Sequence, residues 1–327
     1  MIIHHLFSLT LAYAIDFIVG DPPNWPHPVR WIGNLIAILE RKWNKGPFRK
    51  QKGIGMLLYI LLLVGGIVSL IVWGSYSVHP LLGILVEGMI IATTIAQKSL
   101  KTAALEVFMP LQSGDIREAR KKLSYIVGRD TEQLNEAEIT RGTVETVAEN
   151  TSDGITAPLF WALFGGAPFA VIYRAINTCD SMVGYRNEKY EEFGWASAKL
   201  DDLVNWLPSR LTGFLMFFCK KPIQLSRRAA WGTLFRDAKK HPSPNSGWGE
   251  AAVAVLLGIQ LGGINYYNGV ISNRAKMGEP IVPLQRNHIL HAIMIMARSA
   301  FLFILALWIG GFLIELAITW FQSQLYL

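Results

Sequence analysis

Residues 141–186 read RGTVETVAENTSDGITAPLFWALFGGAPFAVIYRAINTCDSMVGYR, with one polar block on each side of an apolar block. The apolar block, residues 155–173, carries no charged side chain. An uncharged run of this length predicts a membrane-spanning segment. Because Gly165-Gly166-Ala167-Pro168 interrupts the run, we expect two half-length helices that fold back and return both polar blocks to one side. A single spanning helix with ordinary polar flanks is the alternative.

The first polar block predicts a helix with an acidic face. Arg141, Glu145 and Glu149 recur every four residues and therefore share one side of a helix. Asp153 continues this register, although Ser152-Asp153-Gly154 is typical of a helix end. Acidic and amide side chains beside a bilayer are costly unless they are paired or used, so we interpret both polar blocks as parts of a site. The remaining candidates in the two blocks are Asn150, Arg174, Asn177, Asp180, Ser181 and Tyr185.

Composition indicates an integral membrane protein. Of the 327 residues, 51% are hydrophobic and 17% are charged, whereas soluble domains carry roughly 25% charged residues. We predict an all-α, polytopic helical bundle with a broken-helix hairpin, located in the cell membrane with several spans. Residues 1–327 would form a single membrane-embedded domain, with residues 98–150 as a soluble, cytoplasmic helical insertion. The two cysteines exclude a disulfide framework, and the net charge of +7 indicates cytoplasmic loops and not nucleic-acid binding.

Further helices are predicted at 54–78, 81–97 and 292–321, the last broken or tilted near Gly310-Gly311. Glu87 falls inside the second of these segments. An intramembrane carboxylate is a functional candidate, and pairing within the helical bundle is the alternative.

Residues 20–30 read GDPPNWPHPVR and predict a rigid loop, because four prolines in seven residues prevent a helix or a central strand. The loop would hold Asp21, His27 and Arg30 in fixed positions. A stiff connector with a capping aspartate is the alternative.

Two more polar segments lie near the middle and in the second half of the chain. Asp201 and Asp202 point in different directions on a helix, so only one of them would join a site. Residues 242–250 form a Gly/Ser-rich loop that leads into a helix, and such a helix start offers free N–H groups to a phosphate. The candidates in these segments are Asp202, Asn205, Arg210, Ser243, Asn245 and Glu250.

Together the polar segments predict a Mg²⁺-phosphate site at the membrane surface. Carboxylate and amide oxygens suit Mg²⁺, and arginine suits phosphate oxygens. A membrane transporter is the competing class, since broken helices and intramembrane polar groups are typical of transporters. However, the two halves show no matching broken segments, and the polar motifs cluster at helix ends. A non-catalytic scaffold would leave the density of these motifs unexplained.

At these motifs the chain resembles the CobD/CbiB family, the adenosylcobinamide-phosphate synthases of cobalamin biosynthesis. Residues 265–286 match the family pattern nowhere firmly. The segments that carry the resemblance are GDPPNWPHPVRWIG (20–33), ETVAENTSDGITAPLFW (145–161), RAINTCDSMVGY (174–185), DDLVNWLPSRL (201–211) and SPNSGWGEA (243–251).

The resemblance implies an ATP- and Mg²⁺-dependent ligase. A carboxyl group of adenosylcobyric acid is joined to (R)-1-aminopropan-2-ol phosphate, or to a related amino alcohol or its phosphate, which gives adenosylcobinamide phosphate. The corrinoid would be a substrate and not a prosthetic group. The implied partners are the two substrates, the lipid bilayer and other late cobalamin-pathway enzymes, with no nucleic acid.

Beside this resemblance we assign roles as hypotheses. Glu145, Glu149 and Asp153 would hold Mg²⁺ or orient its waters, with Asp180 as the alternative metal ligand. Arg174 and Arg210 would bind phosphate oxygens, and Asp21 or His27 would be the base. The substrate-binding set is completed by Arg30, Asn150, Asn177, Ser181, Tyr185, Asp202, Asn205, Ser243, Asn245 and Glu250.

Overall fold

The computed structural model describes residues 2–22 and 25–325, so Pro23 and Asn24 of the proline-rich loop lie outside the described residues. The chain divides into two compact units. Unit 1 comprises Met1–Ala96, Ala157–Asn205 and Ile304–Leu327, and unit 2 comprises Gln97–Thr156 and Trp206–Phe303. We describe each unit by itself.

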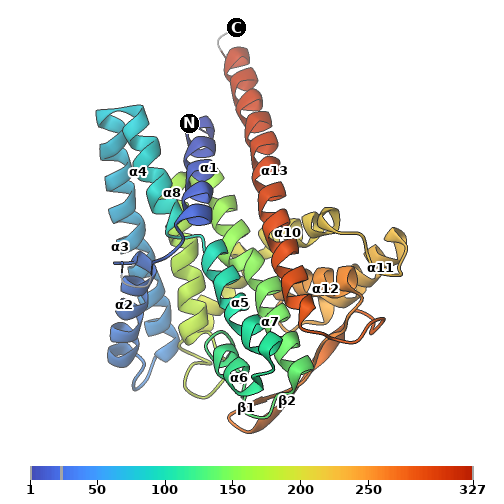
Figure 1. Cartoon of the computed structure of the whole chain (residues 1–327). Helices are drawn as coiled ribbons and strands as arrows, with labels where there is room; N and C mark the ends of the chain where they lie inside the picture. The colour runs from blue at the N-terminus through green and yellow to red at the C-terminus, as the bar shows by residue number, and fades with distance from the viewer. Residues whose placement is uncertain (1, 23–24, 326–327) are drawn as a thin grey trace. The chain divides into compact units, whose positions relative to one another are not determined.

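Unit 1 is built from helices (Figure 1). The longest helix that lies wholly inside it, α3, is uncharged from Gly53 onward and packs beside α4. A tight turn at His79 joins them, because the His79 ring accepts the Leu81 N–H at 3.2 Å and Pro80 opens α4. The helices of unit 1 are α1 (Ile2–Ile18), α2 (Pro28–Trp43), α3 (Arg49–Val78), α4 (Pro80–Ala92), α8 (Ala157–Val183), α9 (Trp195–Val204) and the second part of α13 (Asn287–Leu325).

Among the described residues, four helical segments are long and apolar enough to cross a membrane. This bears out the prediction of a mostly helical chain with membrane-spanning segments. Helix α13 is continuous through Gly310-Gly311, so the break expected there is absent. The four segments are Arg49–Val78, Pro80–Ser113, Glu136–Val183 and Asn287–Gln322.

The predicted interruption of the apolar run is present inside α8. Gly165 and Gly166 have non-helical backbone angles, and Gly166 has φ 59° and ψ −150°, a conformation that is essentially restricted to glycine. On either side of this break, Trp161 donates to the Val204 carbonyl at 3.1 Å and Tyr173 donates to Asn205 at 2.8 Å. A straight helix would separate the Cα atoms of Trp161 and Tyr173 by roughly 18 Å. The break therefore lets both halves of α8 reach the same end of α9.

Glu87 holds the broken end of α8. One carboxylate oxygen accepts the Ala167 N–H at 3.1 Å, and the other accepts the Ser8 hydroxyl at 2.9 Å and the Tyr76 hydroxyl at 2.8 Å. The His5 ring lies 3.2 Å from the carboxylate. Of the two predicted roles for Glu87, pairing within the bundle is the one that these contacts support, since a buried carboxylate must be paired.

Unit 2 has a buried helix at its centre. Helix α12 approaches α7 so closely that a Cβ atom on Gly249 would lie 2.5 Å from the Ala148 carbonyl oxygen. Helix α7 begins with a capping box between Asn135 and Glu138. The elements of unit 2 are α5 (Gln97–Ser113), α6 (Ile116–Ser124), α7 (Glu136–Thr151), a π-helical turn (Ser152–Thr156), α10 (Trp206–Cys219), α11 (Arg227–Asp237), a 3₁₀ turn (Ala238–Lys240), α12 (Ser246–Leu257), β1 (Leu261–Tyr267), β2 (Val270–Met277) and the first part of α13.

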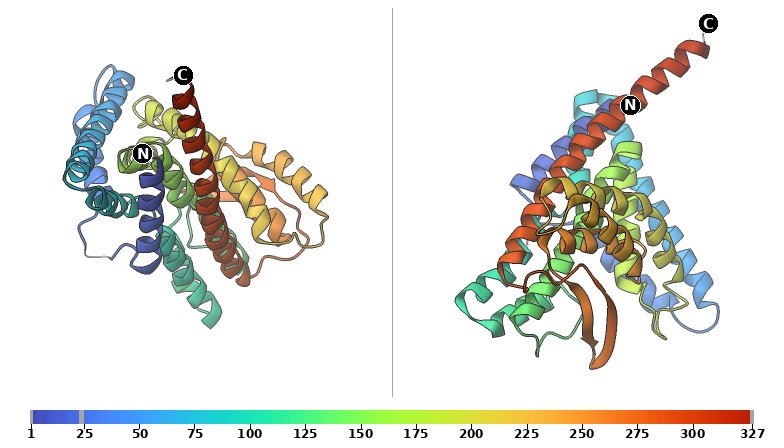
Figure 2. Two further views of the ribbon diagram at one scale, coloured as in Figure 1. Left: turned by 90° about the horizontal axis from the view of Figure 1, so that it is seen from above. Right: turned by 90° about the vertical axis from the view of Figure 1, so that its right-hand side faces the viewer.

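The all-α prediction is wrong for residues 261–277, which form an antiparallel β-hairpin (Figure 2). Tyr267 pairs with Val270, so Asn268-Gly269 is a two-residue turn, and both of its residues have positive φ. The Asp130 carboxylate accepts the N–H groups of Asn268 and Gly269. The polar composition of this segment concealed the hairpin, although the Asn-Gly pair was a signal for it.

We predict that Gly166→Ala destabilises the protein. The added Cβ would lie 1.8 Å from a Glu87 oxygen, and the required backbone angles cost an L-residue about 1–3 kcal/mol. Thermal unfolding in detergent should show a lower Tm than for the wild-type protein. Gly66→Ala is the matched control, because a Cβ on Gly66 in α3 meets nothing within 4 Å. An equal Tm for both variants would contradict the role assigned to the break.

Candidate functional site

The acidic face of α7 lies against the β-hairpin and α12 in unit 2. Glu145 is buried, and one of its oxygens accepts the Gly262 N–H at 2.8 Å while the other forms an ion pair with Arg129. Arg129 also donates to the Asn265 side chain at 2.7 Å, and Arg141 donates to the Gly262 carbonyl at 2.6 Å. Protein groups therefore engage both Glu145 oxygens, which gives this residue a strong role in joining α7 to β1.

Glu149, one turn further along, faces the start of α12. Its Oε1 accepts the Ser246 hydroxyl at 2.8 Å. The Ser243 hydroxyl accepts the backbone N–H groups of Asn245 and Ser246 at 3.2 and 3.4 Å, which shapes the loop that leads into the helix. Glu149 thus lies directly beside the helix N-terminus that the sequence predicted as a phosphate site.

Two buried side-chain atoms near Glu149 have no hydrogen-bond partner among the described residues. His241 Nε2 and Glu250 Oε1 lie 3.5 Å apart, and neither makes a hydrogen bond. His241 Nδ1 lies 3.0 Å from the Ser243 backbone nitrogen and 3.2 Å from the Ser243 carbonyl oxygen. Burial, and then the charges of Glu145 and Glu149, raise the pKa of Glu250 well above its ordinary value. Burial also lowers the pKa of His241, so burial favours the neutral form of both groups.

Arg210 closes the other side of the same loop. Its guanidinium group donates to the Asn245 side chain at 3.3 Å and stacks over the Trp206 and Trp248 rings at 4.4 and 5.2 Å. Ser209 donates to the same Asn245 oxygen at 3.3 Å. The structure therefore brings Arg210, Asn245 and Ser243 together with Glu149 and Glu250, as the sequence predicted for these five residues.

The remaining predicted residues of unit 2 have local contacts. Asn150 donates to the Thr146 carbonyl at 3.0 Å on its own helix. Asp153 lies in the π-helical turn that follows α7 and so leaves the regular register of the acidic face. Among the described residues, no three His, Cys, Asp or Glu side chains are grouped to hold a metal ion.

In unit 1 the proline-rich loop contains a histidine–aspartate pair. His27 Nε2 lies 3.0 Å from Asp21 Oδ1, while His27 Nδ1 accepts the Val29 N–H at 3.3 Å and caps α2. The cap of α2 therefore comes from His27 and not from the aspartate of the alternative prediction, and a site role for the loop stays a prediction. Arg30 follows in the first turn of α2.

Asp201 binds two predicted site residues in unit 1. Its two oxygens accept the side-chain amides of Asn177 at 3.3 Å and Asn205 at 3.1 Å. Asp202 is less buried, and burial raises its pKa while Lys199 and Arg186 act in the opposite direction. The sequence predicted that only one of the two would join a site and named Asp202, whereas these hydrogen bonds bring Asn177 and Asn205 to Asp201.

The other predicted residues of unit 1 lie along the second half of α8 or just beyond it. Ser181 donates to the Thr178 carbonyl of its own helix at 3.0 Å, and Tyr185 is exposed. A Cβ on Gly184 would lie 1.8 Å from the Asp180 carboxylate, which fixes that side chain against the end of the helix. Arg174 lies one turn before Asn177 and Thr178.

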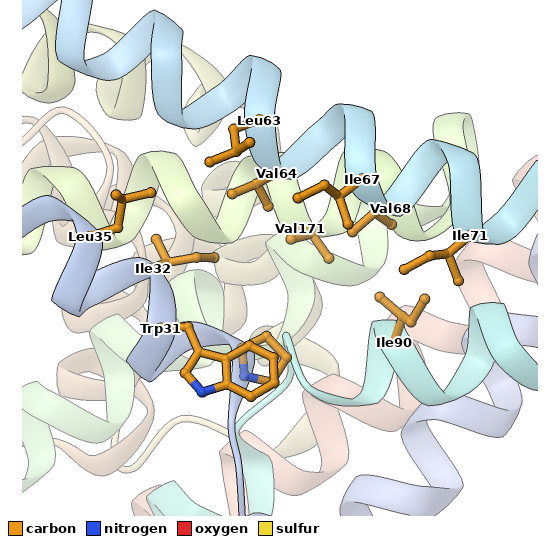
Figure 3. Close-up of a pocket in the computed structure, with 11 residues that line it drawn as sticks. Trp31, Ile32, Leu35, Leu63, Val64, Ile67, Val68, Ile71, Ile90 and Val171 are labelled. Atoms are coloured by element: carbon orange, nitrogen blue, oxygen red, sulfur yellow. The ribbon is translucent and has the colours of Figure 1, made fainter.

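An apolar groove in unit 1 is distinct from these polar clusters. Trp31, Leu35, Leu63, Ile71 and further aliphatic side chains line it (Figure 3). It offers no charged or hydrogen-bonding side chain apart from the indole, so it suits hydrocarbon and not a phosphate.

Comparison with known proteins shows what the chain is related to. The family model of CobD/CbiB proteins matches residues 9–296. The chain belongs to the CobD/CbiB family. The resemblance expected from the five motifs is thereby confirmed. No solved structure matches the chain.

Three relatives illustrate how far the similarity extends. The cobalamin biosynthesis protein CobD of Halalkalibacterium halodurans is 55% identical over 96% of this chain and 99% of its own length. CobD of Clostridium perfringens is 47% identical over 84% of this chain and 88% of its own. The cobalamin biosynthesis protein CbiB of Salmonella typhimurium is 47% identical over 84% of this chain and 87% of its own.

Reasoning from the sequence of this CobD/CbiB protein missed several residues of the polar clusters. His241 was passed over although it directly precedes the Gly/Ser-rich loop, and this position was its only signal. Arg129 and Asn265 had none, because they meet Glu145 only after the β-hairpin has formed. The positive charge of Arg274 in β2 lowers the pKa of Glu250 and of His241. Arg274 lies within the segment that matched the family pattern least.

We predict that Asp201→Asn costs about 1–3 kcal/mol of stability, because an amide nitrogen would replace one acceptor that faces a donor. Asp202→Asn should change the free energy of unfolding by less than about 0.5 kcal/mol, since burial already disfavours its charge. Denaturant unfolding of both variants measures the difference. Equal losses would show that Asp201 does not hold Asn177 and Asn205.

Asp237 gives a pH-dependent prediction. Burial alone would raise its pKa, but hydrogen bonds from Arg236, Lys240 and the Gly278 N–H outweigh burial and lower the pKa from 3.8 to about 2. The resulting stabilisation is complete above about pH 4 and is lost as the pH falls toward 2. The wild-type Tm should therefore fall more steeply between pH 4 and pH 2 than the Tm of Asp237→Asn. Parallel curves would contradict this role.

Proposed function

We propose that this CobD/CbiB protein acts in cobalamin biosynthesis as an ATP-dependent amide ligase of the cell membrane. It would join a carboxyl group of adenosylcobyric acid to (R)-1-aminopropan-2-ol phosphate, or to a related amino alcohol, and give adenosylcobinamide phosphate. The observation that carries the pathway is the 55% identity, over nearly the whole chain, to a protein named for cobalamin biosynthesis. The four candidate spans support several membrane crossings.

The proposed reaction replaces a carboxyl oxygen with an amine nitrogen. ATP would transfer its terminal phosphoryl group to the carboxylate, giving an acyl phosphate and ADP. The amine, after losing a proton, would attack the acyl carbon, form the C–N bond and release phosphate. Such a reaction requires groups that stabilise a transferring phosphoryl group and a group that accepts the proton of the ammonium ion.

The α12 start in unit 2 supports phosphate binding. The N-terminus of a 12-residue helix, the Arg210 guanidinium and the Ser243–Ser246 loop converge there. His241 Nε2 and Glu250 Oε1 have no hydrogen-bond partner in this corner, and a bound substrate would supply one. We therefore propose this corner as the place where a phosphate of ATP or of the amino-alcohol phosphate binds.

One residue of the same corner, Glu149, offers a carboxylate oxygen that suits Mg²⁺. Glu149 has one oxygen occupied by Ser246 and a second that is available for a metal or its water. Mg²⁺ usually takes one or two carboxylates together with substrate phosphates and water, so a cage of three acidic residues is not required. We propose Glu149 and Asp153 as ligands, with Asp180 as the alternative; bound Mg²⁺ would neutralise phosphate charge.

The base that we propose is the Asp21–His27 pair. His27 Nδ1 accepts the Val29 N–H, so Nε2 of the neutral ring carries the proton and donates to Asp21. The Asp21 carboxylate would accept the ammonium proton, and His27 would hold that carboxylate in place. The second polar set of unit 1, Arg174, Asn177, Ser181, Tyr185, Asn205, Arg30 and Asp202, is proposed to bind the corrinoid amides and the phosphate.

A transporter remains the second proposal because a candidate span contains a break at Gly165-Gly166, as helices of transporters do. Against it, the freed Ala167 N–H is bound by Glu87, which leaves less at the break for a cargo to bind. If the protein is a transporter, a corrinoid should cross vesicle membranes without the joint consumption of ATP and amine that the ligase reaction requires.

The test is an assay of the purified protein with ATP, Mg²⁺, adenosylcobyric acid and the amino-alcohol phosphate. We expect ADP release that requires both co-substrates. Glu149→Gln should lower kcat by at least about 100-fold while it keeps the Ser246 hydrogen bond and the wild-type Tm. Glu132→Gln, at an exposed glutamate of the same unit, is the control and should retain activity.

Two results would count against these proposals. Near-normal turnover of Glu149→Gln would remove Glu149 from the site but leave the ligase intact. No ADP release with any amine, together with corrinoid flux in vesicles, would replace the ligase with a carrier.

A further inference from the structure

A continuous aromatic cluster covers one side of unit 2. It is built on α10 and α11, both of which pack on α12 (Figure 1). Neighbouring ring centroids lie between 4.2 and 6.0 Å apart. The ring contacts are Phe218–Phe214, Phe214–Trp231, Phe217–Trp231, Trp231–Phe235 and Phe235–Trp248.

The outer rings of this cluster are exposed. Phe218, Phe235 and Phe214 are 58%, 50% and 47% exposed. Leu207 and Leu211 of α10 extend the same apolar surface. Contiguous exposed aromatic and aliphatic side chains mark a surface that a membrane or another molecule covers.

Most charged side chains around this cluster are cations. Residues 206–236 contain six Lys or Arg residues and no Asp or Glu. Asp237, the last residue of α11, is buried and pairs with Arg236, which also pairs with Glu279. Lys221, Arg227 and Arg228 are exposed in or next to the connection between α10 and α11, and Lys220 is partly exposed. An apolar surface bordered mainly by cations complements a layer of apolar chains with anionic head groups.

A hydrogen bond joins the end of α10 to α13 at the point where the uncharged part of α13 begins. Arg298 donates to the Cys219 carbonyl at 2.9 Å. Arg298 is also the last charged residue before residues 299–314, which are uncharged and belong to a candidate span. If α13 crosses a membrane, the surface of the hydrocarbon layer therefore lies close to the C-terminal end of α10.

Helix α10 is too short to cross that layer. Its 14 residues extend about 21 Å, whereas the hydrocarbon core of a bilayer is about 30 Å thick. Phenylalanine and tryptophan side chains beside lysine and arginine are typical of segments that lie in the membrane interface.

We propose that the α10–α11 aromatic surface lies in the interface of an anionic lipid bilayer, without crossing it. Phe214, Phe218 and Phe235 would be buried among the upper acyl chains, and the cations at the α10–α11 connection would contact lipid phosphates. Trp248 ends the aromatic cluster and also stacks on Arg210, so the same surface would hold the Arg210–Asn245 corner at the membrane. The proposal does not depend on the ligase activity.

Spin labels test this proposal directly. Cys179 and Cys219 are buried, and burial raises the pKa of Cys219 to about 11, so both native thiols label poorly. We would label Phe218→Cys, Phe235→Cys and, as a control on the exposed polar side of α6, Lys121→Cys, each in nanodiscs that contain phosphatidylglycerol. Relaxation by oxygen, which concentrates in lipid, is compared with relaxation by a nickel chelate, which stays in water.

We expect the oxygen-to-nickel ratio at positions 218 and 235 to exceed the ratio at 121 several-fold. Equal ratios would place the surface in water and overturn the proposal. Exclusion of both reagents at 218 and 235 would show that a second protein copy covers the surface, and would overturn it as well. The two labels lie on different helices, so misfolding of one variant, seen as a lowered Tm, leaves the other to decide.

A charge variant tests the choice of lipid. Replacing Lys221, Arg227 and Arg228 together by glutamine should lower the oxygen-to-nickel ratio at position 235 in phosphatidylglycerol discs to its value in phosphatidylcholine discs. An unchanged ratio would show that anionic head groups do not contribute.

Discussion

The close approach of α7 to α12 is the constraint on which the polar site of unit 2 depends. A side chain at Gly249 would collide with the Ala148 carbonyl, so only glycine lets the two helices meet at this point. Their contact places Glu149 beside Ser246 and brings Glu145 near the buried Glu250. Three carboxyl groups in one region repel one another. Arg129 offsets the charge of Glu145, and burial together with the charges of Glu145 and Glu149 raises the pKa of Glu250.

The β-hairpin supplies hydrogen-bonding groups to the buried charged side chains of this cluster. It contributes the Gly262 N–H to Glu145 and the Asn265 side chain to Arg129 and Arg141. At the end of the hairpin away from the turn, the Asp237 carboxylate accepts the Gly278 N–H. The hairpin therefore supports one side of the site, while His241 Nε2 and Glu250 Oε1 lie without hydrogen-bond partners near the 241–246 loop.

Sequence predicted the parts of the fold that local physics determines. Gly165-Gly166-Ala167-Pro168 contains residues that disfavour a continuous helix, and the break is where they lie. The position of Glu87 in an apolar helix announced a buried carboxylate, but its partners His5, Ser8, Tyr76 and Ala167 come from distant segments, so only the structure shows that it is paired. Similarly, helix geometry reduced Asp201 and Asp202 to one candidate, and the packing of α9 on α8 selected Asp201.

The central claim is that phosphate groups bind where α12 begins. Photolabelling with an azido analogue of ATP, followed by mass spectrometry of the peptides, tests it most directly. The account predicts label on residues 206–210 or 241–250, and competition by unmodified ATP. Label confined to other segments, with none on these two, would contradict it.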